Sequence, residues 1–448
     1  MGKPVPNVRR LLIANRGEIA VRIIRACREL EIETVAVYST ADADSLHARM
    51  ADRAVCIGPP PSNKSYLLKE SLVTAALRTG CEAIHPGVGF LSENADFARI
   101  VEKAGLIFIG PRSQTIALLG DKVAARHEAK KAGLPVTPGT EEAVRNAEEA
   151  AAIVRELGFP LIIKAAAGGG GKGMRVVRSK AEIGDNIRLA MREAEANFAD
   201  GRVFIERFIE KPRHVELQIL SAGKGKTAIL GERDCTVQRN HQKLIEESPS
   251  PSVTDAMRAA MADGALKLFD GLGYSGAGTI EFLVEDGAFY FMEVNTRVQV
   301  EHPVSEMVTG TDIIKEQITA CAEGRTSLSP GPCPVRGHAI ECRINALTPG
   351  TVTRLEIPGG PGVRFDSFLT PGCAVPPYYD SMVAKLIVHA GTRPAAILKM
   401  NAALRELVIE GIKTNAAEQR AIINTPVFQT NNYNTNSPIC HGGEAGAA

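Results

Sequence analysis

The longest unbroken run of glycine lies between two lysines and between two short apolar segments. Gly168–Gly171 are consecutive, Lys164 and Lys172 flank them, and residues 161–163 and 174–177 read as strands. Glycine N–H groups are not obstructed by side chains, so they can approach phosphate oxygens, and the lysines add positive charge. The pattern therefore predicts a hairpin that closes over a nucleotide phosphate. The alternative is a flexible hairpin tip without a ligand.

This glycine loop differs from two common phosphate-binding loops. The Walker pattern needs glycine at position 166 and Ser or Thr at position 173, where the chain has Ala166 and Gly173. A dinucleotide-binding fold needs G-x-G-x-x-G after its first strand, and the turn that follows residues 9–14 carries only Gly17. A P-loop enzyme and a nicotinamide or flavin enzyme are therefore disfavoured. A strand–glycine-loop–strand flap is typical of ATP-grasp enzymes.

The composition is that of a globular chain with nearly balanced charge. The 448 residues suggest about three domains at roughly 150 residues each. Lys and Arg total 52 and Asp and Glu total 51, so the net charge of +1 argues against a nucleic-acid partner. No apolar run approaches the roughly 18 residues of a membrane span, and no secretory signal is recognised. Nine cysteines without a C-x-x-C pair indicate a reducing compartment, so we expect a cytoplasmic protein with no membrane partner.

The apolar pattern changes along the chain. Four short apolar segments alternate with helical periodicity, which predicts a parallel sheet, and they lie at 9–14, 34–38, 83–84 and 106–109. From residue 203 onward the pattern is mostly that of strands and hairpins. Helices are expected at 141–157, 255–270 and 393–408.

A hairpin carries two carboxylates. Residues 279–295 read as two strands joined at Asp286-Gly287. With a three-residue loop Glu281 and Glu293 project from the same face, whereas a two-residue loop would put them on opposite faces. Neighbouring carboxylates repel unless a cation lies between them, and hard oxygen ligands suit Mg²⁺ shared with nucleotide phosphates. Asn295 supplies a third oxygen on that face. The alternative is an exposed acidic face.

The segment after this hairpin carries groups that suit a small anion. Arg297, Gln299 and Glu301 alternate, which predicts a strand with all three on the face of Glu293. An arginine beside a glutamine can hold a small planar anion, and Glu301 can take its proton. The polar and basic set at 238–243 can contact phosphate or a second anion. A solvated strand face and a solvated loop are the alternatives.

From about Arg9 to Thr435 the chain resembles biotin carboxylase, the ATP-grasp component of biotin-dependent carboxylases. The matching strings are ANRGEIA at 14–20, HPGVGFLSEN at 85–94, the glycine loop, RHVE at 213–216, GERDC at 231–235, EVNTRVQVEHP at 293–303, ECRIN at 341–345 and PPYYDSM at 376–382. The resemblance implies an α/β and α+β protein with the ATP-grasp fold, an N-terminal parallel-sheet domain, a mobile lid and a C-terminal mixed α+β domain. We expect these at 1–109 for the N-terminal domain, 110–135 for a linker, 136–208 for the lid and 209–448 for the C-terminal catalytic domain.

The resemblance also implies the site residues. ATP would be bound by Lys122, Lys164, Gly168, Gly169, Gly170, Gly171, Glu206, Arg207, Ile209, His214, Gln238, His241, Leu283, Glu281 and Glu293. Mg²⁺ or Mn²⁺ would be held by Glu281, Glu293 and Asn295. Bicarbonate would be bound by Lys243, Arg297, Gln299 and Val300. Arg343 would bind biotin, and the catalytic set would be Arg297, Glu301, Arg343 and Lys243, with Glu301 as the base.

The implied reaction is ATP-dependent carboxylation of biotin N1′ with bicarbonate through carboxyphosphate, as the first half-reaction of an acyl-CoA carboxylase. The chain has no Ala-Met-Lys-Met biotinylation sequence. We therefore expect the biotin carboxyl carrier protein and the carboxyltransferase on separate chains. A homodimer is also expected, in which the helix with Arg25 and Glu29 meets the region of Arg364; a solvated helix face is the alternative.

Three departures from the family pattern concern the acceptor more than the nucleotide. Val88 replaces a usual tyrosine, Asn240 replaces a usual arginine, and the loop at 346–353 is shorter than usual. We therefore expect ATP and bicarbonate activation to be retained while the acceptor site is altered. The rival functions are an ATP-grasp carboxylate–amine ligase, a bicarbonate-dependent carboxylase of a urea or another amide nitrogen, and a catalytically silent nucleotide-binding subunit.

Overall fold

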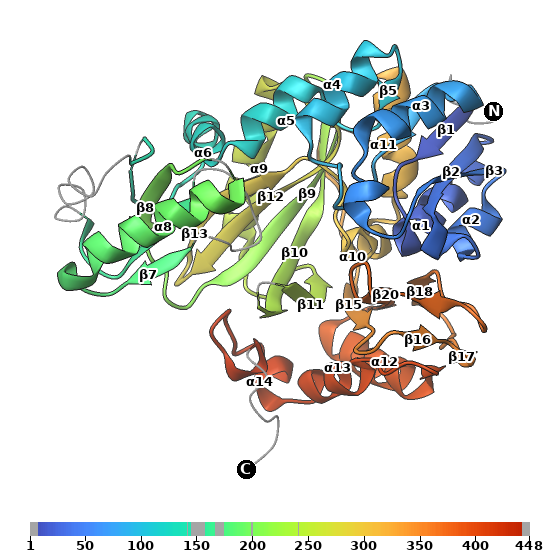
Figure 1. Ribbon diagram of the computed structural model, residues 1–448. Helices are drawn as coiled ribbons and strands as arrows, with labels where there is room; N and C mark the ends of the chain where they lie inside the picture. The colour runs from blue at the N-terminus through green and yellow to red at the C-terminus, as the bar shows by residue number, and fades with distance from the viewer. Residues whose placement is uncertain are drawn as a thin grey trace.

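A computed structural model describes residues 8–140, 142–144, 157–165, 174–198, 200–240 and 242–440. Most of the helix expected at 141–157 lies outside these described residues, as do Gly168–Gly171 and His241. The elements are arranged in an N-terminal unit, a small separate sheet, and a large sheet that runs into the C-terminal part of the chain (Figure 1).

The N-terminal unit confirms the predicted parallel sheet. Its strand order is β3-β2-β1-β4-β5, and every neighbouring pair is parallel. Leu11 and Ile13 belong to one buried cluster and Leu12 and Ala14 to another, so the sheet is covered on both faces, as parallel sheets are. The elements are β1 (Arg10–Ile13), α1 (Gly17–Glu29), β2 (Glu33–Ser39), α2 (Leu46–Met50), β3 (Arg53–Gly58), α3 (Lys69–Thr79), β4 (Ala83–His85), α4 (Ala95–Lys103) and β5 (Ile107–Phe108).

The region expected to be a linker contains two helices, α5 (Ser113–Gly120) and α6 (Lys122–Lys131). Asp121 separates them because its side chain accepts hydrogen bonds from the backbone of Val123 and Ala124, an N-cap that starts a new helix. Lys122 is thereby held at the first turn of α6.

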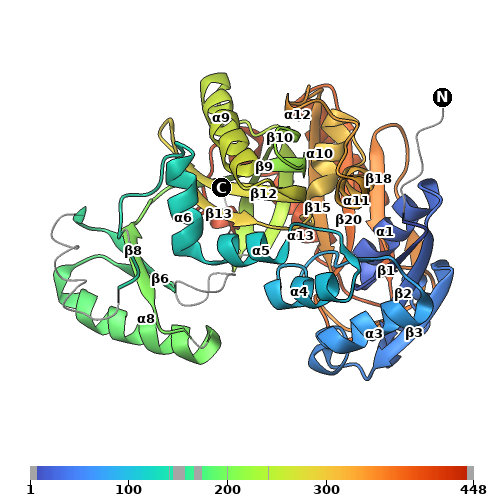
Figure 2. The ribbon, with the colours of Figure 1, turned by 90° about the horizontal axis from the view of Figure 1, so that it is seen from above.

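A small antiparallel sheet, with order β7-β6-β8, occupies the region expected to be the lid and is called the lid below. Its elements are β6 (Leu161–Ala165), β7 (Arg175–Val177), α8 (Ile183–Phe198) and β8 (Val203–Arg207). Leu161, Ile163 and Ile205 pack against Ile187 of α8, so the lid has its own core. Figures 1 and 2 both place this sheet at the end of the molecule away from the N-terminal unit. The glycine loop connects β6 to β7, as the sequence predicts.

The large sheet has the order β13-β12-β9-β10-β11-β15-β20-β18, with β14 parallel to β10. Its strands are β9 (Arg213–Ala222), β10 (Thr227–Arg239), β11 (Gln242–Ser248), β12 (Ser275–Glu285), β13 (Ala288–Asn295), β14 (Gly331–Pro332), β15 (His338–Asn345), β18 (Val363–Ser367) and β20 (Met382–Ala390). The remaining elements are α9 (Asp255–Gly271), α10 (His302–Thr309), α11 (Ile313–Glu323), β16 (Gly350–Thr351), β17 (Arg354–Glu356), β19 (Ala374–Val375), α12 (Arg393–Glu406), β21 (Val408–Glu410), α13 (Ala416–Ile423) and α14 (Pro426–Gln429).

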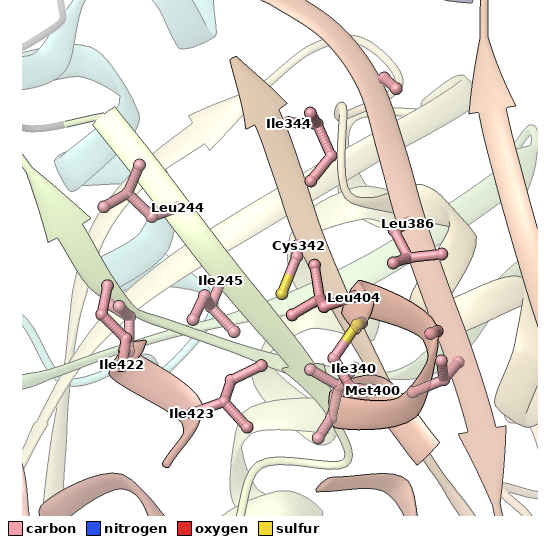
Figure 3. Close-up of a cluster of buried hydrophobic side chains, with 14 of the residues drawn as sticks. Leu244, Ile245, Ile340, Cys342, Ile344, Leu386, Met400, Leu404, Ile422 and Ile423 are labelled. Atoms are coloured by element: carbon pink, nitrogen blue, oxygen red, sulfur yellow. The ribbon is translucent and has the colours of Figure 1, made fainter. Parts of the chain in front are cut away.

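Strand β15 shows how the sheet separates its core from its polar face. Ile340, Cys342 and Ile344 join the apolar cluster formed with α12 and α13 (Figure 3). Because side chains alternate along a strand, Glu341 and Arg343 project from the opposite face. The buried core therefore fixes the direction in which these two charged residues point.

Among the described residues, none of the helices has the length and hydropathy needed to cross a membrane.

One prediction for the hairpin that carries Glu281 and Glu293, and one for the segment after it, are wrong. The connection between β12 and β13 is the two-residue turn Asp286-Gly287, because both residues adopt positive φ values of 49° and 78°. Glu281 and Glu293 nevertheless pair directly, since a bulge between Glu281 and Phe282 restores the register. The expected strand at Arg297–Glu301 is instead an irregular segment that ends as the N-cap of α10.

Candidate active site

A cavity of about 1000 Å³ lies between the lid, the large sheet and the N-terminal loops. Strands β6 and β8 contribute Lys164 and Glu206, and the loop after β4 contributes Val88 and Glu93. The predicted site residues that line it are Lys122, Lys164, Glu206, Arg207, Ile209, His214, Gln238, Lys243, Glu281, Leu283, Glu293, Asn295, Arg297, Gln299, Val300 and Arg343. Gly168, Gly169, Gly170, Gly171 and His241 lie outside the described residues.

Glu281 is the acidic centre of one wall. Its Oε2 lies 2.8 Å from His214 Nε2, and its Oε1 accepts a hydrogen bond from Asn295 at 2.9 Å. Burial alone would raise the pKa of Glu281, but Lys243 and His214 outweigh it and hold the pKa far below its usual range. Burial opposes the charge on His214, yet Glu281 raises the pKa of that imidazole. The wall therefore presents an ionised carboxylate.

Lys243 connects three buried carboxylates. Its Nζ donates to Glu301 at 2.6 Å, to Glu216 at 2.8 Å and to Glu281 at 3.1 Å. Despite burial, these acidic neighbours raise the pKa of Lys243 well above its usual range, so the ammonium keeps its proton. Strand β11 places this side chain beside β9 and β12, which brings together segments far apart in the sequence.

Glu301 lies between Lys243 and Arg343. It is fully buried at the N-cap of α10, and its Oε2 accepts a hydrogen bond from Arg343 Nη2 at 2.9 Å. Burial raises the pKa of Glu301, but Lys243 and Arg343 outweigh it and hold the pKa well below its usual range. The carboxylate is therefore ionised.

Arg297 is oriented by an acidic residue from the N-terminal unit. Its Nε donates to Glu93 at 2.8 Å, and its Nη1 donates to Gln299 at 2.7 Å. Glu93 also accepts from the backbone N–H of Thr296 at 3.0 Å, which fixes the segment that follows β13. Arg297 and Gln299 thus lie side by side on the cavity wall, an arrangement that suits a planar anion.

Ion pairs also lie on the lid side of the cavity. Glu206 accepts hydrogen bonds from Arg126 at 2.7 Å and from Lys164 at 2.6 Å. Lys122 Nζ lies 3.6 Å from Glu293 Oε2. Lys122 and Lys164 line the same cavity as the hairpin carboxylates, so this part of the wall carries both cations and acids.

The donor set of the hairpin fits a magnesium ion. Glu281 and Glu293 are direct partners on β12 and β13, and both line the cavity with Asn295. All three offer oxygen atoms, which Mg²⁺ prefers, and their position near Lys122 allows the phosphates of a nucleotide to complete the coordination. His214, Glu216 and Glu281 also offer ligand atoms within 4.8 Å of one another, and Lys243 donates to both of these carboxylates.

Sequence reasoning missed four charged residues that hold the site residues in place. Glu93 holds Arg297, Glu216 holds Lys243, Glu246 holds Arg343, and Lys385 donates to the carbonyl of Val300 at 2.8 Å. A period-two signal exists for Glu216, which follows His214 on the same face of β9. The other three come from segments whose contact with the site depends on tertiary packing.

Comparisons with known proteins agree with this geometry. Family models for the biotin carboxylase N-terminal domain, the ATP-binding domain of the carbamoyl-phosphate synthase L chain and the biotin carboxylase C-terminal domain match residues 7–116, 121–327 and 341–437. Biotin carboxylase 1 of Bacillus subtilis (strain 168) is 51% identical over 438 residues, covering 96% of this chain and 97% of that protein. Biotin carboxylase of Pseudomonas aeruginosa is 50% identical and covers 94% of this chain and 95% of that protein.

Solved structures show the same fold. The biotin carboxylase of Campylobacter jejuni, solved as a β,γ-ATP complex, has a TM-score of 0.93 at 44% identity and covers 96% of this chain and 98% of that one. The biotin carboxylase domain dimer of Hydrogenobacter thermophilus 2-oxoglutarate carboxylase, solved with MgADP, ADP and bicarbonate, has a TM-score of 0.93 at 42% identity. It covers 98% of this chain and 99% of that one.

Proposed function

The chain belongs to the biotin carboxylase family and catalyses the ATP-dependent carboxylation of biotin, and we propose that the residues around Lys243 carry this reaction. The observation that supports the assignment is a continuous set of contacts beside the cavity. Glu281 contacts Lys243, Lys243 contacts Glu301, and Glu301 contacts Arg343. A carboxylate on the nucleotide side, a base and an acceptor-side arginine are thereby held together.

The reaction assigns a task to each group. Bicarbonate is held by Arg297, Gln299, Lys243 and Val300. Glu301 removes its proton, and an oxygen of the bicarbonate then attacks the γ-phosphorus of ATP. ADP leaves, and the carboxyphosphate that forms decomposes to CO₂ and phosphate. The phosphate takes the proton from biotin N1′, and the nitrogen attacks CO₂. Arg343 stabilises the negative charge that develops on the ureido oxygen of biotin.

The nucleotide is assigned to the lid side of the cavity. Lys122, Lys164, Glu206, Arg207, Ile209, His214, Gln238, Leu283, Glu281 and Glu293, with His241 and Gly168–Gly171, form the proposed ATP site. Glu281, Glu293 and Asn295 would hold Mg²⁺, which neutralises charge on the transferring phosphoryl group. Residues 136–208 would act as the lid, because water destroys carboxyphosphate and the reaction needs a closed site.

The partners follow from the relatives. The similar proteins are biotin carboxylase subunits or domains, and one solved relative is a domain dimer. We propose that this chain is a homodimer that receives biotin on a separate carrier protein, and that the carboxylated carrier then goes to a separate carboxyltransferase.

The N-terminal domain at 1–109, the linker at 110–135 and the catalytic domain at 209–448 remain the proposed divisions.

The first experiment measures phosphate release from MgATP with and without bicarbonate and free biotin. We expect release that depends on bicarbonate, increases with biotin, and is lost without Mg²⁺. Release that requires bicarbonate but responds to urea or an amide in place of biotin would support the rival acceptor. Release that requires an amine and not bicarbonate would indicate a carboxylate–amine ligase, and no release would indicate a silent subunit.

The acceptor side supports an altered biotin contact at Val88. Asn15 Nδ2 donates to the carbonyls of Pro86 at 2.8 Å and Val88 at 2.7 Å, so this loop is held firmly at the cavity wall. Val88 and Phe90 both line the cavity, and valine presents a smaller side chain to it than tyrosine would. Asn240 also lines the cavity, with a φ of 49°.

Replacing Val88 with tyrosine is expected to lower the KM for free biotin roughly two- to tenfold. An added aromatic contact of ordinary strength, about 0.5–1.5 kcal/mol, accounts for that range. Steady-state phosphate release at saturating MgATP and bicarbonate, with biotin varied, provides the measurement. Val88→Ile adds bulk without a ring and serves as the control. An unchanged or higher KM in Val88→Tyr would contradict a vacant biotin contact at this position.

A further inference from the structure

Two carboxyl groups face each other behind Arg343. Glu246 on β11 and Glu341 on β15 are direct register partners, and both have 0% relative exposure. Partners of this kind have Cβ atoms about 5 Å apart and point to the same face. The opposite face of β15 packs in the apolar cluster of Figure 3, so neither side chain can turn away from the other.

The oxygens of this carboxyl pair, Glu246 and Glu341, are unequally satisfied. Oε1 of Glu246 accepts from Arg343 Nε at 2.6 Å and lies 2.5 Å from Arg343 Nη2. Oε2 of Glu246 and both oxygens of Glu341 have no hydrogen-bond partner among the described residues. Three unpartnered carboxyl oxygens in one buried place require an explanation, because two adjacent buried carboxylates repel strongly.

The neighbouring cations do not offset two negative charges. Lys385 on β20 is the cation that most favours the ionised form of Glu341, but it is the register partner of Arg343, lies 3.1 Å from Glu18 and donates to the carbonyl of Val300. Arg343 is shared between Glu246 and Glu301. The charged or titratable groups around the carboxyl pair, and around Lys385, are Lys243 on β11, Arg343 on β15, Lys385 on β20, Glu301 and His302 at α10, Glu18 on α1 and Arg364 and Asp366 on β18.

The titration behaviour agrees with a single charge on the carboxyl pair. Burial raises the pKa of Glu246 to about 7 even though Arg343 opposes the shift. Burial also raises the pKa of Glu341 well above its usual range, and Lys385 does not cancel it. Arg343 favours the ionised form of Glu246, so Glu341 is the member that keeps a proton.

We propose that Glu246 and Glu341 hold one proton between them at neutral pH, carried by Glu341, and that the charged Glu246 is a positioning residue for Arg343. The proposal rests on the role of Arg343 toward biotin. Arg343 lines the cavity, and Glu246 and Glu301 hold its Nε and Nη2. Its Nη1 makes no hydrogen bond with the described residues. Nη1 is therefore available to the acceptor. A second negative charge on Glu341 would strengthen the hold on the guanidinium and weaken its contact with the ureido oxygen.

Glu341→Gln tests the proton through stability. When folding raises the pKa of a carboxyl group, the stability that the group contributes to the fold is fully present below its unfolded pKa of about 4.3. This contribution is lost as the pH rises through the folded pKa. Glutamine has no proton to lose, so we expect the Tm of Glu341→Gln to exceed that of the wild-type protein by a difference that grows from pH 5 to pH 9. An equal loss of Tm at every pH would overturn the proposal, because it would mean that Glu341 is a carboxylate paired with Lys385.

Glu247→Gln is the matched control. Glu247 is the next residue on β11 and is also buried, but His338, Arg393 and Tyr433 satisfy its oxygens. Against the effect of burial, His338 and Arg393 lower the pKa of Glu247 to about 2. Its replacement should therefore lower the Tm at neutral pH, with the opposite pH dependence. If Glu341→Gln fails to fold, Glu341→Met takes its place in an infrared comparison with the wild-type chain: loss of a protonated carboxylic acid band at pH 7 supports the proposal, and an unchanged band overturns it.

The positioning role is tested by the pH profile of biotin-dependent phosphate release. We expect the wild-type rate to fall at alkaline pH as the carboxyl pair loses its proton, and Glu341→Gln to remove that fall. Glu246→Gln is expected to lower the biotin-dependent rate roughly tenfold above pH 7, where Glu246 is charged, because a charge-assisted hydrogen bond is lost, and the difference from the wild-type protein should shrink below pH 7. A fall that persists unchanged in Glu341→Gln would overturn the positioning role. The Tm and infrared results need no activity, so they stand apart from the proposed function.

Discussion

Replacing Glu301 with glutamine is expected to lower bicarbonate-dependent phosphate release by a factor on the order of 10²–10⁴, the usual contribution of a general base. Glutamine keeps the size of the side chain but has one acceptor oxygen, so it can keep only one of the two contacts that Glu301 makes with Lys243 at 2.6 Å and with Arg343 at 2.9 Å. It cannot take the proton of bicarbonate. The measurement is the steady-state rate at saturating MgATP, with biotin present and absent.

The two conditions separate the possible roles of Glu301. Loss of release in both means that the carboxylate acts when carboxyphosphate forms. Loss only of the part that biotin stimulates would place its action at the acceptor. Nucleotide affinity should change little, because Glu301 contacts Lys243 and Arg343 and is not one of the residues assigned to the ATP site. Turnover within a few-fold of the wild-type value would contradict the assignment of Glu301 as the base.

Replacing Lys243 with methionine is expected to destabilise the fold by about 3–5 kcal/mol at pH 7, the cost of leaving buried charges without their partner. Lys243 donates to Glu216, Glu281 and Glu301, and each of these carboxylates is buried. Methionine fills a similar volume but supplies no charge. The free energy of unfolding in denaturant, followed by circular dichroism, provides the measurement.

The pH dependence of this loss has a definite sign. The pKa values of Glu281 and Glu301 are lowered in the folded protein against the effect of burial, with Lys243 as the largest opposing cause. The stability that they contribute is present above their unfolded pKa of about 4.3 and is lost as the pH falls toward the folded values. The defect of Lys243→Met should therefore be large at pH 7 and shrink toward pH 4.

An exposed lysine provides the control for this variant. Lys267 forms an i,i+4 pair with Asp263 on the surface of α9 at 2.6 Å. Pairs of this kind contribute about 0.3–0.5 kcal/mol, so Lys267→Met should change stability little. Equal losses for the two variants would mean that the buried contacts of Lys243 add nothing specific.

Local patterns were enough to predict several elements and the main residues of the site. The parallel sheet, the strands on either side of the glycine loop and the helices α9 and α12 follow from apolar periodicity. The Glu281–Glu293 pair was predicted on one face, but the reason was wrong, because a bulge and a two-residue turn replace the three-residue loop. A bulge leaves no clear mark in composition, since the same residues fit a regular strand.

The irregular segment from Arg297 to Glu301 shows a second limit. Its alternating residues read as a strand, yet the chain leaves β13 at Asn295 and turns into α10. Glu93, which is 204 residues away along the chain, holds Arg297 in place. This ion pair gives the charge of Arg297 a partner within the fold. The sequence around either residue contains no signal that identifies the other.

The amino-acid sequence alone determined which residues can do chemistry: the glycine loop with its lysines, the hairpin carboxylates, and the arginine, glutamine and glutamate of 297–301. Tertiary structure alone decided which of them meet. Lys243 on β11 reaches Glu281 on β12 and Glu301 at the start of α10 because the fold brings these three segments together, and Glu246 faces Glu341 because of strand register. Spacing along a chain specifies the face of a strand, whereas register and burial, which set the charge of a carboxyl group, arise only when distant strands pack together.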